Sequence, residues 1–197
     1  MTRQKTDEVR KQQIRAAATR CFVRRGFAAT RLLDIAREAG LSKGGVYFHY
    51  RAKEALFHDI LEAQFVALQD RWGADQAADQ PADKALHALV AAHLQTLEAS
   101  PDEARFCNLM LAMASQNPDF RDKLTPILTT MRTRYGDLVR RGTAAGVFTA
   151  SDPDNIAVGI IALVYGLAAQ SAGDEKATLP VRAEAGADLA VRLARGG

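Results

Sequence analysis

Residues 30–53 hold two short helical patterns separated by a tight turn. This segment constrains the fold more than any other segment of the chain. Apolar residues from Leu32 to Ala39 recur at helical spacing, and Gly40 can end that helix in the left-handed conformation. Ser42 can cap the next helix, at about 43–50, with its hydroxyl. A helix, a short glycine-containing turn and a second helix form the helix-turn-helix pattern, whose second helix enters the major groove of DNA.

The second helix of this pattern is weak by composition. Gly44 and Gly45 each cost about 0.8–1 kcal/mol relative to alanine inside a helix, and so short a helix is marginal alone. We therefore expect Val46 and Tyr50, which lie four residues apart on one face, to hold it by packing. The two glycines also allow a ligand to approach the backbone closely. Thr30 is expected to cap the preceding helix with its hydroxyl.

The opposite face of the second helix carries basic and aromatic side chains. Lys43, Tyr47 and His49 can donate hydrogen bonds to phosphate oxygens, and Phe48 lies between them in the sequence. Lys53 opens the next helix and is expected to point at the same DNA backbone. The alternative is a small three-helix core with a solvated basic face and no DNA contact.

Many residues between positions 26 and 56 stand at fixed offsets: Gly26-Phe27, Thr30, Asp34-Ile35-Ala36, Ala39 to Gly44, Val46-Tyr47, Tyr50 and Lys53 to Leu56. In these offsets the segment resembles the TetR/AcrR family of bacterial transcriptional repressors. Arg31, Gly45 and the Arg51-Ala52 pair depart from the residues common there, which bears on the operator sequence. The resemblance implies that Thr30, Lys43, Tyr47, His49 and Lys53 fall on positions that contact phosphates or bases. The full set of predicted DNA-binding residues adds Arg31, Ser42, Gly44, Gly45 and Phe48.

Charge is distributed unevenly along the chain. Residues 1–53 hold 13 Lys and Arg against 4 Asp and Glu, whereas residues 54–197 hold 13 against 19. The excess positive charge that a nucleic-acid partner would require therefore lies in the N-terminal part. No apolar run of the signal-peptide kind follows the polar residues 1–13, which form either an arm that touches DNA or, as we favour, a disordered terminus. Cys21 and Cys107 show no metal or disulfide spacing, and two buried thiols are typical of a cytoplasmic protein.

The remainder of the chain is predicted to be helical, which makes the protein all-α. We expect an N-terminal three-helix helix-turn-helix domain at 1–52, with the motif at about 31–50, and a helical ligand-binding and dimerisation domain at 53–197. Ser100, Asn117 and Asp152, each followed by proline, signal helix starts. Pro126 should kink or restart one helix. The expected helices run from 51 to about 72, after which a polar connection covers 73–83, and then over 82–99, 101–115, 118–145, 153–172 and 180–195.

The helix expected from Pro153 is apolar nearly all round. It is shorter than a membrane span requires and acidic residues flank it, so we place it inside the protein or at an interface. Gly159 and Gly166 lie seven residues apart on one face and permit close helix approach. The resemblance implies that the last two long helices pair with those of a second copy. On that ground the dimer-interface residues are Gly159, Leu163, Gly166 and Leu189.

The resemblance also implies that the helices after the DNA-binding domain enclose a pocket for a small inducer. We expect a small, largely apolar ligand, since methionine suits adaptable pockets and tyrosine or asparagine can orient a ligand. Each candidate also has a plain alternative as a core or solvated residue. The candidates are His93, Arg105, Asn108, Met110, Met113, Tyr135 and Tyr165.

The function favoured by these patterns is a ligand-responsive dimeric repressor that binds a palindromic DNA operator in the cytoplasm. An enzyme is disfavoured, because the sequence contains no phosphate-binding glycine loop, no zinc motif and no nucleophile elbow. We expect no catalytic residues, cofactor, metal or membrane partner. A constitutive DNA-organising or oligomer-forming protein that binds no small molecule is the remaining alternative, and a solidly packed second domain would favour it.

Overall fold

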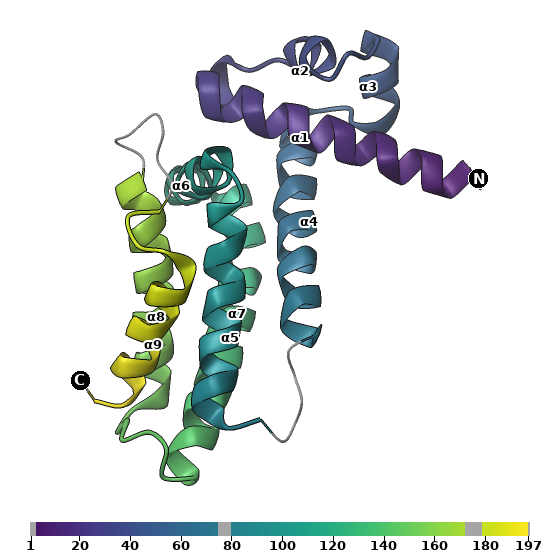
Figure 1. Ribbon diagram of the computed structural model, residues 1–197. Helices are drawn as coiled ribbons and strands as arrows, with labels where there is room; N and C mark the ends of the chain where they lie inside the picture. The colour runs from purple at the N-terminus through teal and green to yellow at the C-terminus, as the bar shows by residue number, and fades with distance from the viewer. Residues whose placement is uncertain (1–2, 75–79, 172–178, 197) are drawn as a thin grey trace. The chain divides into compact units, whose positions relative to one another are not determined.

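The structure is a computed structural model that describes residues 3–74, 80–171 and 179–196 (Figure 1). Every regular element within these ranges is a helix, which confirms the all-α prediction. Two compact units, Met1–Gln64 and Phe65–Gly197, divide within α4. The helices are α1 (Arg3–Ala29), α2 (Leu32–Glu38), α3 (Lys43–His49), α4 (Lys53–Ala74), α5 (Ala82–Glu98), α6 (Pro101–Gln116), α7 (Pro118–Ala144), α8 (Pro153–Gln170) and α9 (Ala183–Ala194).

Three phenylalanines form the centre of the first unit. Phe22 and Phe27 come from α1 and Phe57 from α4, and their ring centroids lie 5.3–5.6 Å apart. Ile14 of α1 and Ile35 of α2 are fully buried in the same unit. Aromatic rings bury large apolar areas and favour such tilted and edge-to-face pairs. This core fixes α1 and the start of α4 as the support for the helix-turn-helix.

The turn between α2 and α3 has the predicted chemistry. Gly40 adopts φ 65°, and the Leu41 N–H donates to the Ala36 carbonyl at 2.9 Å, as in a Schellman motif. The Ser42 hydroxyl then accepts the Gly45 N–H at 3.1 Å and caps α3. Both the glycine stop and the serine cap are confirmed.

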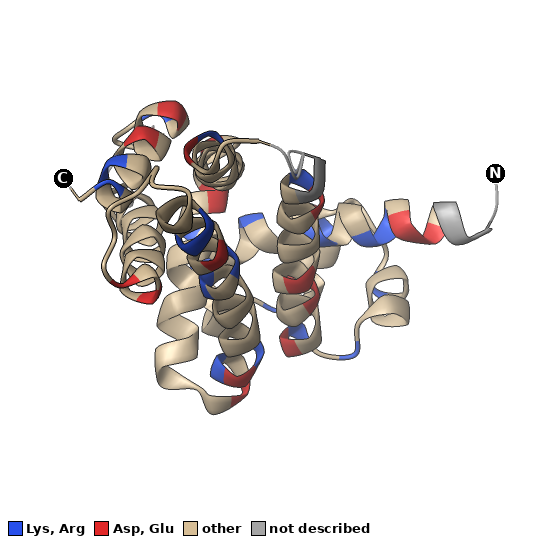
Figure 2. Ribbon diagram, turned by 90° about the horizontal axis from the view of Figure 1, so that it is seen from below, with Lys and Arg blue, Asp and Glu red and all other residues tan. Residues whose placement is uncertain are grey.

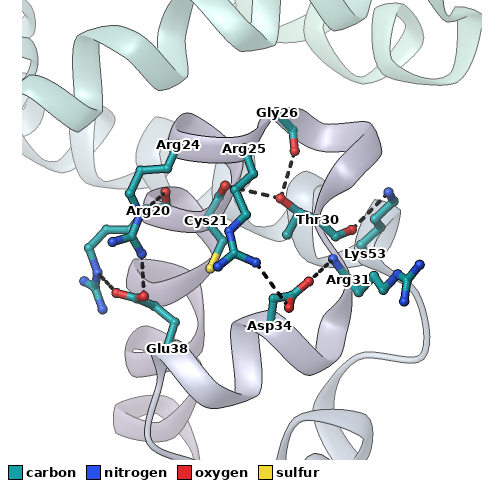
Figure 3. A network of polar contacts seen from close by, with 10 residues as sticks. All are labelled: Arg20, Cys21, Arg24, Arg25, Gly26, Thr30, Arg31, Asp34, Glu38 and Lys53. Atoms are coloured by element: carbon teal, nitrogen blue, oxygen red, sulfur yellow. Dashed lines mark hydrogen bonds and ion pairs between the residues drawn. The ribbon is translucent and has the colours of Figure 1, made fainter.

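The prediction that Thr30 caps α2 is wrong. Arg31 occupies the cap position, and its backbone N–H donates to the Asp34 carboxylate at 3.0 Å. Thr30 is fully buried and its hydroxyl bonds the carbonyls of Gly26, at 2.8 Å, and Cys21, at 3.2 Å (Figure 3). Gly26 breaks the helical conformation of α1 with φ 78°. A break of this kind leaves carbonyls without helical partners, and the hydroxyl satisfies them.

In the second unit α5 packs against α9, and α7 packs against α8 (Figure 1). The predicted caps are confirmed, because the side chains of Ser100, Asn117 and Asp152 each accept a backbone N–H two residues ahead at 2.9–3.1 Å. α7 runs unbroken through Pro126, so the helix does not restart there. Of the polar connection expected at 73–83, residues 75–79 lie outside the described residues, whereas α4 continues to Ala74 and α5 begins at Ala82.

Candidate nucleic-acid interface

α3 is held by two buried side chains, as predicted. Val46 is fully buried and Tyr50 is 6% exposed. Tyr50 follows the last residue of α3, and its backbone N–H donates to the Val46 carbonyl at 2.9 Å. Val46 is the one fully buried side chain within α3 itself. The orientation of this short helix therefore depends on very few anchors.

The outward face of α3 combines bare backbone with an exposed aromatic and a cation. Phe48 is 75% exposed. The Lys43 ammonium lies 5.4 Å from the centre of the Tyr47 ring, which is close enough for a cation–π contact. A Cβ added at Gly44 would meet only the Ser42 hydroxyl, at 3.9 Å. This surface can approach another molecule closely at its backbone.

Two predicted DNA-binding side chains point instead into the unit. His49 has a side chain only 8% exposed, and its Nδ1 lies 3.5 Å from the Asp7 carboxylate of α1. The Lys53 ammonium donates to the carbonyls of Phe27, Ala28 and Thr30 at 2.7, 2.9 and 3.1 Å, and the last of these lies beside it in Figure 3. An ammonium has three donors, so these bonds use all of them. The geometry favours Lys53 as a clamp between α4 and the corner that joins α1 to α2.

Several arginines of α1 are paired with carboxylates of α2 (Figure 3). Arg20 and Arg24 both bind Glu38, and their hydrogen bonds lower the pKa of this carboxyl below its usual value. The pKa of Asp34 is lowered first by the backbone N–H of Arg31 and then by the charge of Arg25, which lies 3.2 Å away. These cations hold α2 against α1 and are less available to DNA.

Several other cations of the first unit are exposed. Near the N-terminus α1 shows an acidic band followed by a basic band (Figure 2), which corresponds to Asp7-Glu8 and Arg10-Lys11. Sequence reasoning missed Arg37 at the end of α2 and Arg51 after α3. Their position next to the motif could have indicated them. Four cations around the motif are exposed and make no ion pair among the described residues: Arg31, Arg37, Lys43 and Arg51.

Three of the predicted ligand-binding residues meet in the second unit. His93 of α5 and Tyr135 of α7 lie edge-to-face against Trp72 of α4, and Tyr165 of α8 lies edge-to-face against His93, with ring centroids 6.0–6.4 Å apart in each pair. His93 Nδ1 lies 3.2 Å from the Tyr135 hydroxyl. Burial lowers the pKa of His93 to about 4, so the imidazole is neutral. Sequence reasoning missed Trp72 and also Met131, whose sulfur lies 3.8 Å from the Tyr165 hydroxyl.

The other ligand candidates have different surroundings. The Asn108 amide donates to the Ala168 carbonyl at 2.9 Å and joins α6 to α8. Arg105 lies 4.0 Å from Asp102 at the start of α6. Met110 is buried and Met113 is half-buried. These four residues therefore show a packing or surface role in addition to any contact with a ligand.

α8 leaves an apolar face uncovered. Val158 is 48% exposed, and Leu189 and Leu193 of the neighbouring α9 are each 39% exposed. A Cβ at Gly166 would meet nothing within 4 Å, whereas one at Gly159 would lie 3.0 Å from Leu193 of the same chain. Gly159 thus serves the packing of α8 on α9. Leu163 is half-buried. A groove beside this face, of about 310 Å³, is lined by Thr125, Leu128, Thr129, Arg132, Val158 and Ile161.

By length and composition, α8 is also the one helix among the described residues that could cross a membrane. A single such helix is a weak indication, because helices of soluble proteins pass the same test. The Asp152 side chain accepts the N–H groups of Asp154 and Asn155 at the start of α8, which is an ordinary cap in water.

An exposed short helix, held by α1 and α4 and followed by a helical second unit, defines a helix-turn-helix transcriptional regulator. Residues 14–60 match the family described as bacterial regulatory proteins, tetR family. Residues 82–194, more than half of the chain, match the family described as BetI-type transcriptional repressor, C-terminal. The chain belongs to the TetR/AcrR family.

Relatives share both the motif and the whole fold. The HTH-type transcriptional regulator YerO of Bacillus subtilis is 47% identical over 53 residues, which are 27% of this chain and 18% of YerO. The regulator RutR of Escherichia coli K12 is 29% identical over 158 residues, 78% of this chain and 71% of RutR. A transcriptional regulator from Saccharomonospora viridis, solved in complex with choline, is 25% identical with a TM-score of 0.77 and covers 93% of this chain and 94% of its own.

Proposed function

We propose that this regulator is a repressor that binds a palindromic operator as a homodimer and is released by a small ligand held in the second unit. The observation that carries the proposal is the outward face of α3. There an open glycine backbone, an exposed phenylalanine and an exposed lysine occur together. We place the protein in the cytoplasm, where the DNA of a bacterium lies.

Contacts with DNA are divided among the residues of the motif by what each can reach. Lys43, Arg37 and Arg51 neutralise phosphates, because their charges are exposed and unpaired among the described residues. Phe48 packs on thymine methyl groups, the apolar feature of the major groove. Tyr47 donates its hydroxyl to phosphate. Of the remaining predicted contacts, Thr30, Ser42, His49 and Lys53 act mainly through the shape of the motif, and Arg31, Gly44 and Gly45 lie at the DNA surface.

Selection of bound fragments from genomic DNA tests the proposed operator. A two-fold dimer reads two half-sites about 34–36 Å apart, so the recovered sequences should be palindromes with that spacing. Recovery of fragments that share no motif would favour the constitutive DNA-organising alternative. Binding of no DNA by the pure protein would refute the proposal.

Lys43→Ala and Lys53→Ala should differ in the salt dependence of operator binding. The slope of log K against log salt is negative, and loss of one phosphate contact lowers its magnitude by about 0.9. We expect this change in Lys43→Ala. Lys53→Ala should weaken binding with the slope unchanged, because its ammonium already bonds three carbonyls. The measurement is fluorescence anisotropy of labelled operator between about 50 and 200 mM salt, over which the loss of phosphate contacts changes the affinity strongly.

Lys84→Ala serves as the control for these two variants. Lys84 is exposed on α5 of the second unit, so its removal changes the net charge equally without touching the motif. A lower slope in Lys53→Ala would return Lys53 to the phosphate contacts. An unchanged slope in Lys43→Ala would remove Lys43 from them.

The dimer is proposed to form through the uncovered face of α8 and α9. No charged residue lies between Asp154 and Asp174 in the sequence. Only 28% of the residues in α8 are buried within the chain and Val158 is 48% exposed, so part of this apolar helix would otherwise face water. Gly166 and Leu189 lie on this face, whereas Gly159 supports it from within the chain.

The ligand is proposed to enter among the rings around Trp72. The Arg134 guanidinium lies 5.5 Å from the centre of the Trp72 ring, and its buried Nε has no hydrogen-bond partner among the described residues. An unsatisfied buried donor costs roughly 1–3 kcal/mol, which a rearrangement on ligand binding can relieve. Tyr135 and Tyr165 could then orient the ligand through their hydroxyls.

Choline is the first compound to test, because the similar Saccharomonospora viridis regulator was solved with it and aromatic rings bind quaternary ammonium groups. Trp72 is the only tryptophan of the chain, so its fluorescence reports on this cluster. Saturable quenching together with loss of operator binding would support release by population shift. Saturation without a change in operator affinity would refute it.

One observation favours the constitutive alternative. Tyr135 is fully buried and Trp72 is 1% exposed, so the cluster is tightly packed without a ligand. A screen of small cations and apolar compounds by Trp72 fluorescence separates the two functions. A protein that binds operator but responds to no compound would be a constitutive DNA-binding regulator.

A further inference from the structure

A polar cluster joins α1 and α4 to Tyr50, the residue that follows α3 in the first unit. The Tyr50 hydroxyl donates a hydrogen bond to the Asp59 carboxylate of α4. Arg15 of α1 donates to the same carboxylate oxygen at 3.2 Å and reaches Glu8 with its other nitrogen. Asp59 is thus the common acceptor for the residue that ends α3 and for a cation of α1.

This cluster is placed where α3 is least supported. α3 has seven residues, two of them glycine, and one fully buried side chain. A helix this short and weak in propensity takes its orientation from tertiary contacts. Tyr50, immediately after α3, is the second anchor, and its buried hydroxyl requires a partner. Asp59 supplies that partner.

The groups that face Asp59 define its charge environment. The Arg15 side chain is 17% exposed and that of Asp59 is 31% exposed, so the pair is partly shielded from water. Burial, followed by the hydrogen bond to Asp59, raises the pKa of Tyr50. Tyr50 therefore remains a neutral hydroxyl that donates to the carboxylate at neutral pH.

We propose that Asp59 is a positioning residue for operator binding, which fixes the orientation of α3 through Tyr50 and Arg15 without touching DNA. The proposal rests on the proposed role of α3 as the DNA-binding helix. Removal of the tie leaves α3 folded on Val46 but free to tilt. Specific binding, which requires base contacts at defined positions, then suffers more than non-specific attraction to phosphates.

Asp59→Asn and Glu62→Gln form a matched pair that tests the proposal. Both remove one negative charge from α4, and Glu62 is exposed. A charge effect alone would strengthen binding to polyanionic DNA in both variants. If Asp59 positions α3, Asp59→Asn should instead weaken operator binding roughly 10-fold. This factor corresponds to the free energy of about one hydrogen bond to a charged group. Its affinity for unrelated DNA should be unchanged or slightly higher.

Tyr50→Phe keeps the ring and removes the hydroxyl. It should lower operator affinity to a similar extent, and the double variant Tyr50→Phe/Asp59→Asn should lose less than the sum of the two single changes. Urea unfolding of each variant confirms that the protein is fully folded at the assay temperature. A merely structural role would reduce specific and non-specific binding by the same factor.

The outcomes separate this inference from the function on which it rests. If Asp59→Asn strengthens operator binding as Glu62→Gln does, or lowers specific and non-specific affinity equally, Asp59 is no positioning residue. Lys43→Ala, measured alongside, shows whether α3 binds DNA at all. A weakened Lys43→Ala with an unaffected Asp59→Asn would overturn the inference alone, whereas no effect in either would overturn the proposed interface.

Discussion

Gly166→Glu is expected to yield a folded monomer that binds a palindromic operator roughly 100-fold or more weakly, because two linked half-site contacts become one. Gly166 lies on the uncovered face of α8, and a side chain added there meets nothing within 4 Å in the chain. The substitution therefore leaves the fold of the protomer intact. In a dimer, the introduced side chain would bury an unpaired carboxylate in the apolar interface with the second copy.

Sedimentation or light scattering should show the change of mass, and anisotropy with whole and half operators should show the change of binding. Affinity for a single half-site should remain, since α3 is untouched. Ala112→Glu, at an exposed position of α6, is the control for an added charge on a helix of the second unit. A Gly166→Glu protein that stays dimeric would place the interface elsewhere.

The sequence predicted the helix-turn-helix because its signals are local. The left-handed glycine at Gly40 and the cap at Ser42 depend on the residue itself and its near neighbours. The burial of Val46 and Tyr50 follows from their spacing on one face. The helix starts marked by a cap residue and proline were confirmed for the same reason.

Side-chain partners distant in sequence could not be predicted in this way. The position of Thr30 before a helix predicts a cap, but its hydroxyl binds the carbonyls of Gly26 and Cys21 instead. The spacing of apolar residues does not indicate that the helix breaks at Gly26. Lys53 and the carbonyls it binds lie 23–26 residues apart. The ring cluster joins Trp72 to Tyr135, and no pattern links two positions so far apart. Such contacts arise when helices pack together, and local sequence patterns do not specify which distant side chains then meet.

Gly44→Ala is expected to stabilise the protein while weakening its binding to operator. The backbone of Gly44 has no positive φ, and an added Cβ meets only the Ser42 hydroxyl at 3.9 Å. Alanine should therefore raise the free energy of unfolding by about 0.8–1 kcal/mol, the propensity difference in a helix. Nothing inside the described fold requires glycine at this position. We propose that close approach of the backbone to DNA is the reason for glycine here.

The methyl group added by Gly44→Ala should then collide with the DNA backbone. Forcing an extra methyl into a packed contact costs roughly 1–3 kcal/mol, which corresponds to about a 5- to 150-fold loss of operator affinity. Urea unfolding and operator anisotropy on the same samples measure the two effects. A higher free energy of unfolding together with a lower operator affinity would be informative, because a damaged fold would lower both quantities.

Ala112→Gly provides the reverse change at an exposed helical site far along the chain from the motif. It should lower stability by a similar amount, about 1 kcal/mol, and leave operator affinity unchanged. A stabilised Gly44→Ala protein with full affinity would mean that α3 does not approach DNA at its backbone. Operator contact would then depend on the side chains of Lys43, Tyr47 and Phe48 alone. In that case these side chains would hold the helix away from the phosphates, and alanine at position 45 should be tolerated as well.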